Sequence, residues 1–193
     1  MRKIIILTVI LFAVCCQATE GQTEKDFKLE IKELEIIHVL GMSSLISDNY
    51  NLIGQLWERF EVRQHEVSNP VDSKIGIGIS YGIQSSNSDS QKPDYLYFHL
   101  VGIPVSEIGE VPEGMTWKNV PAGLYAKFTH KGSLQNLSET YAFIFNQWLP
   151  ESGYTYDPSK VDFELYDDRF DMEDAESEFD IYVPIVLLAE EKK

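Results

Sequence analysis

The chain has 193 residues, 44% of them apolar, which suits a single globular domain with a buried core or two tightly joined halves. Its formal net charge is −15 at pH 7, so the chain as a whole repels nucleic-acid phosphates and we expect no nucleic-acid partner. Both cysteines, Cys15 and Cys16, lie near the N-terminus, so a disulfide-stapled fold is excluded as well.

Residues 1–18 have the pattern of a secretory signal peptide. Two basic residues precede an apolar run over residues 4–14, which is too short to span a bilayer comfortably, and Ala18 supplies a small residue before the cleavage site. The pattern predicts a protein outside the cytoplasm, either periplasmic or secreted. Alternatively, Cys16 is the attachment point of a lipid anchor, as in a lipoprotein, although the usual small residue does not precede it.

The polar residues 19–26 are predicted to form a flexible leader, followed by one folded domain over residues 27–188 and a charged tail over residues 189–193. Within the domain, the element order strand, helix, strand, strand is predicted twice. The two halves cover about residues 27–103 and 115–188.

In the first half, alternating apolar residues over positions 27–39 predict a long strand with an irregularity. Asp48 or Asn49 is expected to cap a helix that extends to about Val62. Two further strands are predicted over residues 74–83 and 94–101.

In the second half, residues 115–130 predict a strand that Pro121 and Gly123 interrupt. Residues 133–149 predict a helix that Pro150 ends, and two strands follow around residues 163–168 and 179–187. This order predicts an α+β fold built from duplicated β-α-β-β halves. Its antiparallel sheet carries the helices on one face and leaves a ligand cleft between the halves on the other.

The strand over residues 74–83 has one apolar face and one bare face. Isoleucines and Tyr81 alternate with Gly76, Gly78, Ser80 and Gly82. Glycines repeated on one face of a strand predict the close approach of a ligand or of another backbone.

Two strands of the second half combine an acidic and two aromatic side chains. If each strand is extended, Glu164, Tyr166 and Tyr182 face one way, and their apolar neighbours, including Phe163 and Ile181, face the other. An enclosed carboxylate among aromatic rings is a candidate cation site. Alternatively, Glu164 is a solvated carboxylate and the tyrosines are structural. Alternation places Tyr95 and Tyr97 on a second aromatic face.

The order of motifs resembles the GyrI-like small-molecule-binding domain, also known as the AraC-type effector-binding domain, over about residues 27–188 and most strongly over the second half of the chain. The matching stretches are Pro121-Ala122-Gly123-Leu124-Tyr125-Ala126, His130-Lys131-Gly132, Tyr141, Trp148-Leu149-Pro150, Ser152-Gly153-Tyr154, Phe163-Glu164-Leu165-Tyr166 and Asp180-Ile181-Tyr182-Val183-Pro184-Ile185.

The resemblance implies a fold of two SH2-like halves with a ligand site at their junction. It implies that Glu164 is buried and meets cationic or electron-poor aromatic ligands, and that Tyr125, which matches the family's strand tyrosine, is a cavity candidate. Trp57 and Trp148 lie on apolar helix faces and are expected in the core rather than in a ligand wall.

Other chemistry finds less support in the sequence. Ser80 lies in a G-x-S-x-G pattern, but a Ser-rich loop follows where a serine hydrolase needs a strand-to-helix elbow. The four histidines are dispersed and the acidic loop before Asp180 lacks the EF-hand glycine, so we expect no metal and no cofactor. The haem-binding SOUL proteins have a comparable duplicated fold, and His99 is the only histidine on a candidate pocket face.

Three functions remain as hypotheses. The first is a binding module, of the multidrug-binding kind, that sequesters or senses a small cationic or aromatic lipophilic compound. The second is a GyrI-like hydrolase of cyclopropane-bearing electrophiles, with Glu164 as base and Tyr182 as acid. The third is a protein-interaction scaffold of the cell envelope. No DNA-binding helix pair is expected before Phe27, and the oligomeric state stays open.

Overall fold

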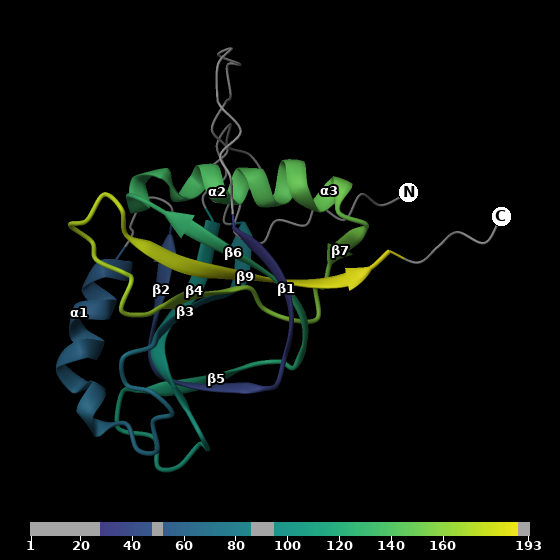
Figure 1. The fold of residues 1–193 in the computed structure, drawn as a ribbon. Coiled ribbons are helices and arrows are strands. Elements are labelled where there is room, and N and C mark those ends of the chain that lie inside the picture. The colour runs from purple at the N-terminus through teal and green to yellow at the C-terminus, as the bar shows by residue number, and fades with distance from the viewer. Residues whose placement is uncertain (1–27, 48–51, 86–94, 189–193) are drawn as a thin grey trace.

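The computed structural model describes residues 28–47, 52–85 and 95–188, and these residues form one antiparallel sheet with helices on one face (Figure 1). The strands are β1 Leu29–Leu34, β2 Ile37–Ser47, β3 Gly76–Ser85, β4 Tyr95–Val105, β5 Thr116–Val120, β6 Gly123–Lys131, β7 Tyr154–Tyr156, β8 Phe163–Tyr166 and β9 Glu178–Leu187. The helices are α1 Ile53–Arg63, η1 Gln64–Glu66, η2 Leu134–Asn136, α2 Leu137–Phe143, η3 Ile144–Trp148 and α3 Leu149–Glu151.

The order of strands in the sheet is symmetrical about its centre. It runs β1-β6-β9-β8-β3-β4-β2-β5, with β7 paired to β9 at one end. Each side of the centre combines three strands of one half of the chain with an edge strand from the other half, because β1 pairs with β6 and β5 pairs with β2. The junction of the halves is the pair β3 and β8, where Gly78 lies opposite Glu164.

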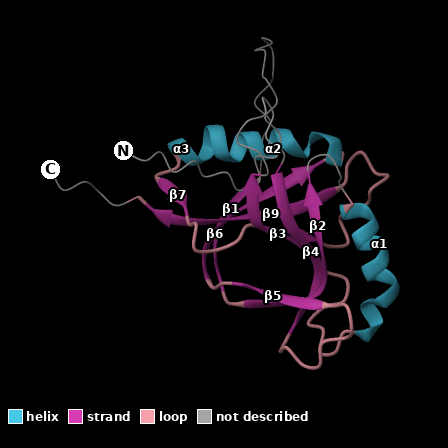
Figure 2. Ribbon diagram, turned by 180° about the vertical axis from the view of Figure 1, so that it is seen from behind, coloured by secondary structure: helices cyan, strands magenta, loops and turns pink. Residues whose placement is uncertain are grey.

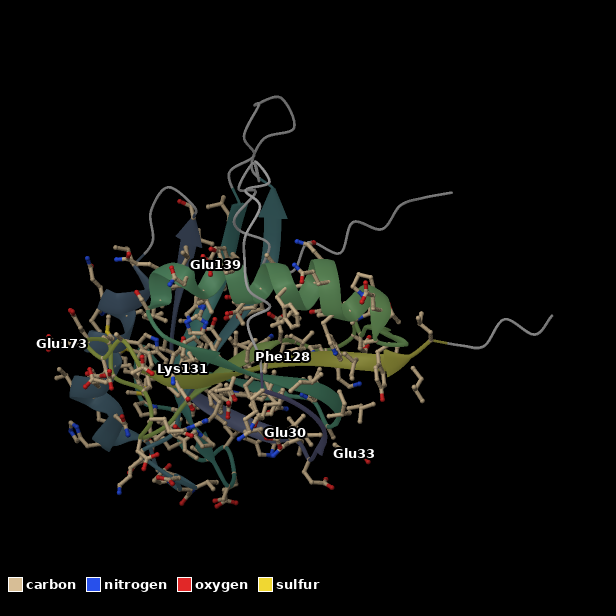
Figure 3. The ribbon with its side chains drawn as sticks, turned by 45° about the horizontal axis from the view of Figure 1, so that its top comes forward. Glu30, Glu33, Phe128, Lys131, Glu139 and Glu173 are labelled. Carbon is tan, nitrogen blue, oxygen red and sulfur yellow. The ribbon has the colours of Figure 1, made fainter. Side chains whose placement is uncertain are left out.

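Both long helical segments cover the same face of the sheet. Leu56 and Phe60 of α1 pack on Leu40 and Met42 of β2, and α2 with η3 packs on β6 and β9. In Figure 3, the side chain of Phe128 on β6 lies between the strand and the helix, where its ring contacts Phe143 and Trp148 edge-on.

The opposite face of the sheet carries a third apolar cluster. It contains Val39, Ile77, Ile79, Leu100, Val120, Tyr125, Phe163 and Tyr182. The sheet curls strongly, as Figure 2 shows, so that β5 lies at the opposite end of the molecule from α2. Two apolar clusters on the helix face and one on the opposite face therefore pack against the sheet from both sides.

The α+β class, the antiparallel sheet and the helices on one face confirm the fold expected from the sequence. The first strand is instead two strands, β1 and β2, which lie far apart in the sheet. Pro150 does not end its helix. It lies in the last turn, α3, after a π-helical segment, and the helix ends before Gly153, whose φ is 75°.

Several expectations fall on residues outside the described ranges. These are the signal peptide over residues 1–18 with Cys16, the leader over residues 19–26, the capping Asp48 or Asn49 and the tail over residues 189–193. Within the described ranges, every helix is too short or too polar to cross a membrane.

Candidate functional site

A cavity of about 700 Å³ opens on the helix face of the sheet, between α1 and α2. The sequence predicted the cleft on the opposite face, but an apolar cluster fills that face, and Glu164 and Tyr166 lie on the face that the helices cover. Its floor comes from β3, β4 and β8, and its walls come from α1, from η2, α2 and η3, and from the loop after β8. Both halves of the chain therefore contribute to it. Its volume falls in the range of about 300–1,000 Å³ that is usual for small-molecule sites.

Glu164 of β8 points into this cavity and is held by two tyrosines. Its Oε1 accepts a hydrogen bond of 2.7 Å from the hydroxyl of Tyr141 on α2, and its Oε2 accepts one of 2.6 Å from the hydroxyl of Tyr166. Protein encloses the carboxyl group on the sides that do not face the cavity. This burial raises the pKa of Glu164, and the two hydrogen bonds partly oppose the rise. In the described part of the chain, the carboxylate has no ion pair.

A second buried carboxyl group, Asp162, lies two residues before Glu164. It accepts a hydrogen bond of 3.1 Å from the hydroxyl of Tyr156, and burial raises its pKa to about 7. The negative charge of Glu164 acts in the same direction. The beginning of β8 thus has two acidic groups in a poorly solvated part of the molecule.

The bare face of β3 lies under the cavity and is approached by side chains rather than by a backbone. A β-carbon at Gly76 would lie 2.9 Å from Cη2 of Trp57, so the indole ring rests directly on the strand. The same ring packs edge-on against Tyr166, with centroids 5.6 Å apart. Trp57 therefore lines the cavity as well as the core, whereas the sequence predicted only the core.

His99 of β4 is also part of the cavity floor. Its Nδ1 lies 2.9 Å from Oγ of Ser80, and a β-carbon at Gly78 would lie 3.2 Å from its Nε2. Burial lowers the pKa of His99 to about 4, so the ring is neutral at neutral pH. Ser80 lies in the middle of a strand, which differs from the strand-to-helix turn that a serine nucleophile needs.

The charged residues of the cavity lining are mainly acidic. Glu58 and Glu61 of α1 and Asp167 after β8 line it together with Glu164, and Lys74 is the cationic residue among the described lining residues. Arg169 holds Asp167 through two hydrogen bonds of 2.8 Å, which lower the pKa of that carboxyl group. The remaining lining is mostly apolar or aromatic, so the cavity suits an apolar molecule with positive charge.

The structure separates the tyrosines that the sequence grouped together. Tyr97 and Tyr166 line the cavity with Glu164, whereas Tyr125 and Tyr182 lie in the apolar cluster on the opposite face of the sheet. The side chain of Tyr95 lies outside the described residues.

The placement of Tyr182 corrects the prediction that it shares a face with Glu164 and Tyr166. Phe163 pairs with Tyr182 and Glu164 with Ile181, so Tyr182 stacks on the ring of Phe163, with centroids 4.5 Å apart. The alternation within each strand was predicted correctly, but a shift of one residue in register exchanges the faces of the whole partner strand.

Tyr141 contacts Glu164 but was not among the expected site residues. Its position on the apolar side of the second helix favoured a role in the core, and its ring does pack in the apolar cluster between α2 and the sheet. The hydroxyl group of Tyr141 was the signal that could have identified it as a site residue, because the hydroxyl group of a buried tyrosine usually has a hydrogen-bond partner.

Comparison with known proteins identifies the family. Residues 30–185 match the model of the integron-associated effector binding protein, Cass2. The transcriptional regulator BrlR of Pseudomonas aeruginosa is 36% identical over 162 residues, which are 83% of this chain and 56% of BrlR. The chain thus spans about half the length of that curated relative.

Solved structures have the same fold at low sequence identity. SAV2435 bound to tetraphenylphosphonium is 12% identical with a TM-score of 0.61, and the match covers 82% of this chain and 94% of SAV2435. An integron cassette protein from Vibrio cholerae is 15% identical with a TM-score of 0.53, over 83% of this chain and 97% of that protein. The fold and the family match confirm a GyrI-like effector-binding domain. The chain belongs to the family of integron-associated effector binding proteins.

Proposed function

We propose that the chain is a binding module whose cavity takes a small lipophilic cation with aromatic groups. The observation that carries this proposal is Glu164, a carboxylate enclosed at the junction of the halves and held by two tyrosine hydroxyls, with no cationic partner among the described residues. A cation in the cavity offsets the cost of burying the negative charge and favours the ionised form of the carboxyl group.

The rest of the lining supports the same class of ligand. The faces of Trp57, Tyr97 and other aromatic rings attract positive charge, and the apolar walls bind an apolar ligand body. The similarity to SAV2435, which is bound to the lipophilic cation tetraphenylphosphonium, also supports it. We propose further that the protein acts outside the cytoplasm, because residues 1–18 have the pattern of a signal peptide.

The test is titration of tetraphenylphosphonium into the wild-type protein, Glu164→Gln and the matched control Glu61→Gln, measured by calorimetry. We expect saturable binding by the wild type and a loss of about 10- to 100-fold in Glu164→Gln, because a buried charge pair contributes more than an exposed one. Glu61 is exposed on the cavity rim, so its substitution should change the affinity by less than about threefold.

If the wild type does not bind the cation saturably, or if both variants bind as the wild type does, the proposed function is wrong. In the first case the envelope scaffold becomes the better hypothesis.

A hydrolase of cyclopropane-bearing electrophiles is a second candidate, because two hydroxyl groups lie within hydrogen-bonding distance of the Glu164 carboxylate. The acid would be Tyr141 or Tyr166, since Tyr182 lies on the other face of the sheet. Incubation with a cyclopropane-bearing alkylating compound and mass spectrometry for the water adduct tests this candidate. Unchanged substrate would exclude it.

A further inference from the structure

β1 forms one end of the sheet. One side of this strand pairs with β6, and within the described ranges no strand pairs with its other side. Such an edge presents backbone N–H and C=O groups that can pair with a strand of another molecule. Leu29 and Ile31 on this strand are 38% and 40% exposed, so the edge also leaves apolar surface in contact with water.

The pairing with β6 shows which backbone groups of β1 point outward. The backbone oxygen of Lys28, just before the strand, accepts a hydrogen bond of 3.0 Å from the backbone N–H of Thr129 on β6. In an antiparallel pair, alternate residues bond to the same neighbouring strand. Every second residue from Lys28 onward therefore bonds to β6. The residues between them, which direct their N–H and C=O groups to the free edge, are Leu29, Ile31 and Glu33.

Two copies of β1 can pair antiparallel about a two-fold axis at Ile31. Ile31 then faces Ile31 of the second copy and Leu29 faces Glu33, so outward-directed groups meet in both pairs. Between these pairs, Glu30 faces Lys32 of the second copy, and by symmetry Lys32 faces Glu30. The other registers that align outward-directed residues over three or more positions place Glu30, Lys32 or Glu33 opposite itself, where like charges destabilise the pair.

Charge favours this register although the whole chain is acidic. Residues 28–34 contain two lysines and two glutamates, so this segment is neutral in a chain of net charge −15. Glu30 and Lys32 of one copy already contact each other at 3.1 Å, and pairing brings the same two groups of the second copy beside them. At about 0.15 M salt the Debye length is about 8 Å, so the repulsion between more distant carboxylates is largely screened.

We propose that β1 is a dimerisation edge, at which two copies of this chain pair antiparallel about Ile31 and join their sheets into one. Two-fold symmetry is the commonest in homo-oligomers, and it uses the same edge of both copies. A strand pair of this length is a small interface, so the dimer should have a dissociation constant of about 10–100 µM. β1 supplies none of the described lining residues of the cavity, so the proposed dimer does not depend on the proposed ligand.

The test is sedimentation velocity at about 0.15 M salt over a series of protein concentrations from about 1 to 500 µM. The wild type is compared with Ile31→Lys, Lys32→Glu and the matched control Trp117→Lys. Trp117 is 48% exposed on β5, the strand at the opposite end of the sheet, so its substitution changes the apolar surface of the other edge. Circular dichroism verifies that each variant is folded.

We expect the wild type and Trp117→Lys to pass from monomer to dimer with the same dissociation constant. Ile31→Lys places two ammonium groups opposite each other at the axis, and Lys32→Glu places two glutamates opposite each other on both sides of it. Each substitution should therefore weaken the dimer at least about tenfold.

A wild-type protein that stays monomeric through this range would overturn the proposal. So would a dimer that both β1 variants form as tightly as the wild type. A dimer that is lost only in Trp117→Lys would place the contact at β5 and overturn the proposal as well.

Hydrogen exchange of the wild-type protein, measured by NMR, tests the register without any variant. The outward-directed N–H groups of Leu29, Ile31 and Glu33 should exchange fast in the dilute protein and become protected as the concentration rises. The N–H groups of Glu30 and Lys32 bond to β6 and should be protected throughout, which makes them the internal control. Outward-directed groups that are equally protected at every concentration, as when another segment or a bound peptide occupies the edge, contradict the proposal, and so do groups that stay unprotected in the concentrated protein.

Discussion

The two tyrosines that hold Glu164 come from different elements, and each donates to a different carboxylate oxygen. Tyr166 follows Glu164 on the same face of β8, and Tyr141 reaches it from α2. Burial raises the pKa of Glu164, and the two hydroxyl groups work against that rise because they stabilise the ionised form. They therefore keep the carboxyl group able to ionise and bind a cation.

Tyr141→Phe and Tyr166→Phe should each raise the pKa of Glu164, because each removes a hydrogen bond that stabilises the ionised carboxylate. Binding of tetraphenylphosphonium, whose charge does not depend on pH, should weaken as the pH falls through that pKa. In either variant the weakening should begin at a higher pH than in the wild type. Calorimetric titrations over a series of pH values measure this shift.

Tyr81→Phe is the control for these titrations, since the hydroxyl group of Tyr81 bonds Ser43 at 3.0 Å and not Glu164. A variant at Tyr141 or Tyr166 with the same pH profile as the wild type would show that its hydroxyl group does not stabilise the carboxylate.

Asp162 should make the protein less stable as the pH rises from about 4 to about 7. Its pKa rises on folding from 3.8 to about 7. In that window the folded state keeps a proton that the unfolded chain has released, so the free energy of unfolding falls with rising pH, by at most about 4 kcal/mol from this group. Asp162→Asn should make the decline shallower, as urea denaturation at several pH values can measure. Equal slopes in both proteins would contradict the assignment.

At the scale of elements, glycines set how closely strands and helices approach. At Gly76 on β3 a β-carbon would meet the end of the Trp57 side chain at 2.9 Å. Gly41 and Gly102 face each other across β2 and β4, and a β-carbon at Gly102 would lie 2.5 Å from the backbone oxygen of Leu40. A side chain can move aside where a paired backbone cannot, so these glycines differ in function.

Gly76→Ala should therefore weaken cation binding and change the fluorescence of Trp57, with little loss of stability. Gly102→Ala should instead lower the free energy of unfolding by more than about 3 kcal/mol. Gly54→Ala in α1 is the control for stability. It has no atom within 4 Å of the added carbon and should gain up to about 1 kcal/mol from helix propensity. Chemical denaturation and cation titration give both readouts. A Gly102→Ala protein as stable as the wild type would show that the two strands can move apart.

At the scale of the whole molecule, the halves exchange their edge strands. β1 belongs to the first half of the chain but pairs with β6 of the second, and β5 belongs to the second half but pairs with β2 of the first. The two strands at the centre, β3 and β8, complete the connection. Each half alone would lack one edge strand and expose the side of its central strand, which makes the halves dependent on each other.

We expect that fragments covering residues 28–110 and 111–188 do not fold separately and that mixing them restores structure. The intact domain should unfold in a single cooperative step. Far-UV circular dichroism during urea denaturation measures all three samples. A fragment that unfolds cooperatively by itself would show that its half is an independent unit.

The sequence by itself determined the type and order of the main elements, the faces within each strand and the presence of a carboxylate among aromatic residues. These features depend on residue spacing along the chain, as in β3, where isoleucine alternates with glycine. The second helix was found in the same way, although its end was misplaced by the effect assigned to Pro150.

Only the tertiary structure decided which side chains meet. The register of β8 on β9 placed Tyr182 on the face opposite Glu164, and the packing of two helices brought Tyr141 and Trp57 to the cavity. Periodicity defines a face only relative to its own strand or helix. The pairing of strands far apart in the sequence fixes how these faces combine, and that pairing depends on packing over the whole sheet.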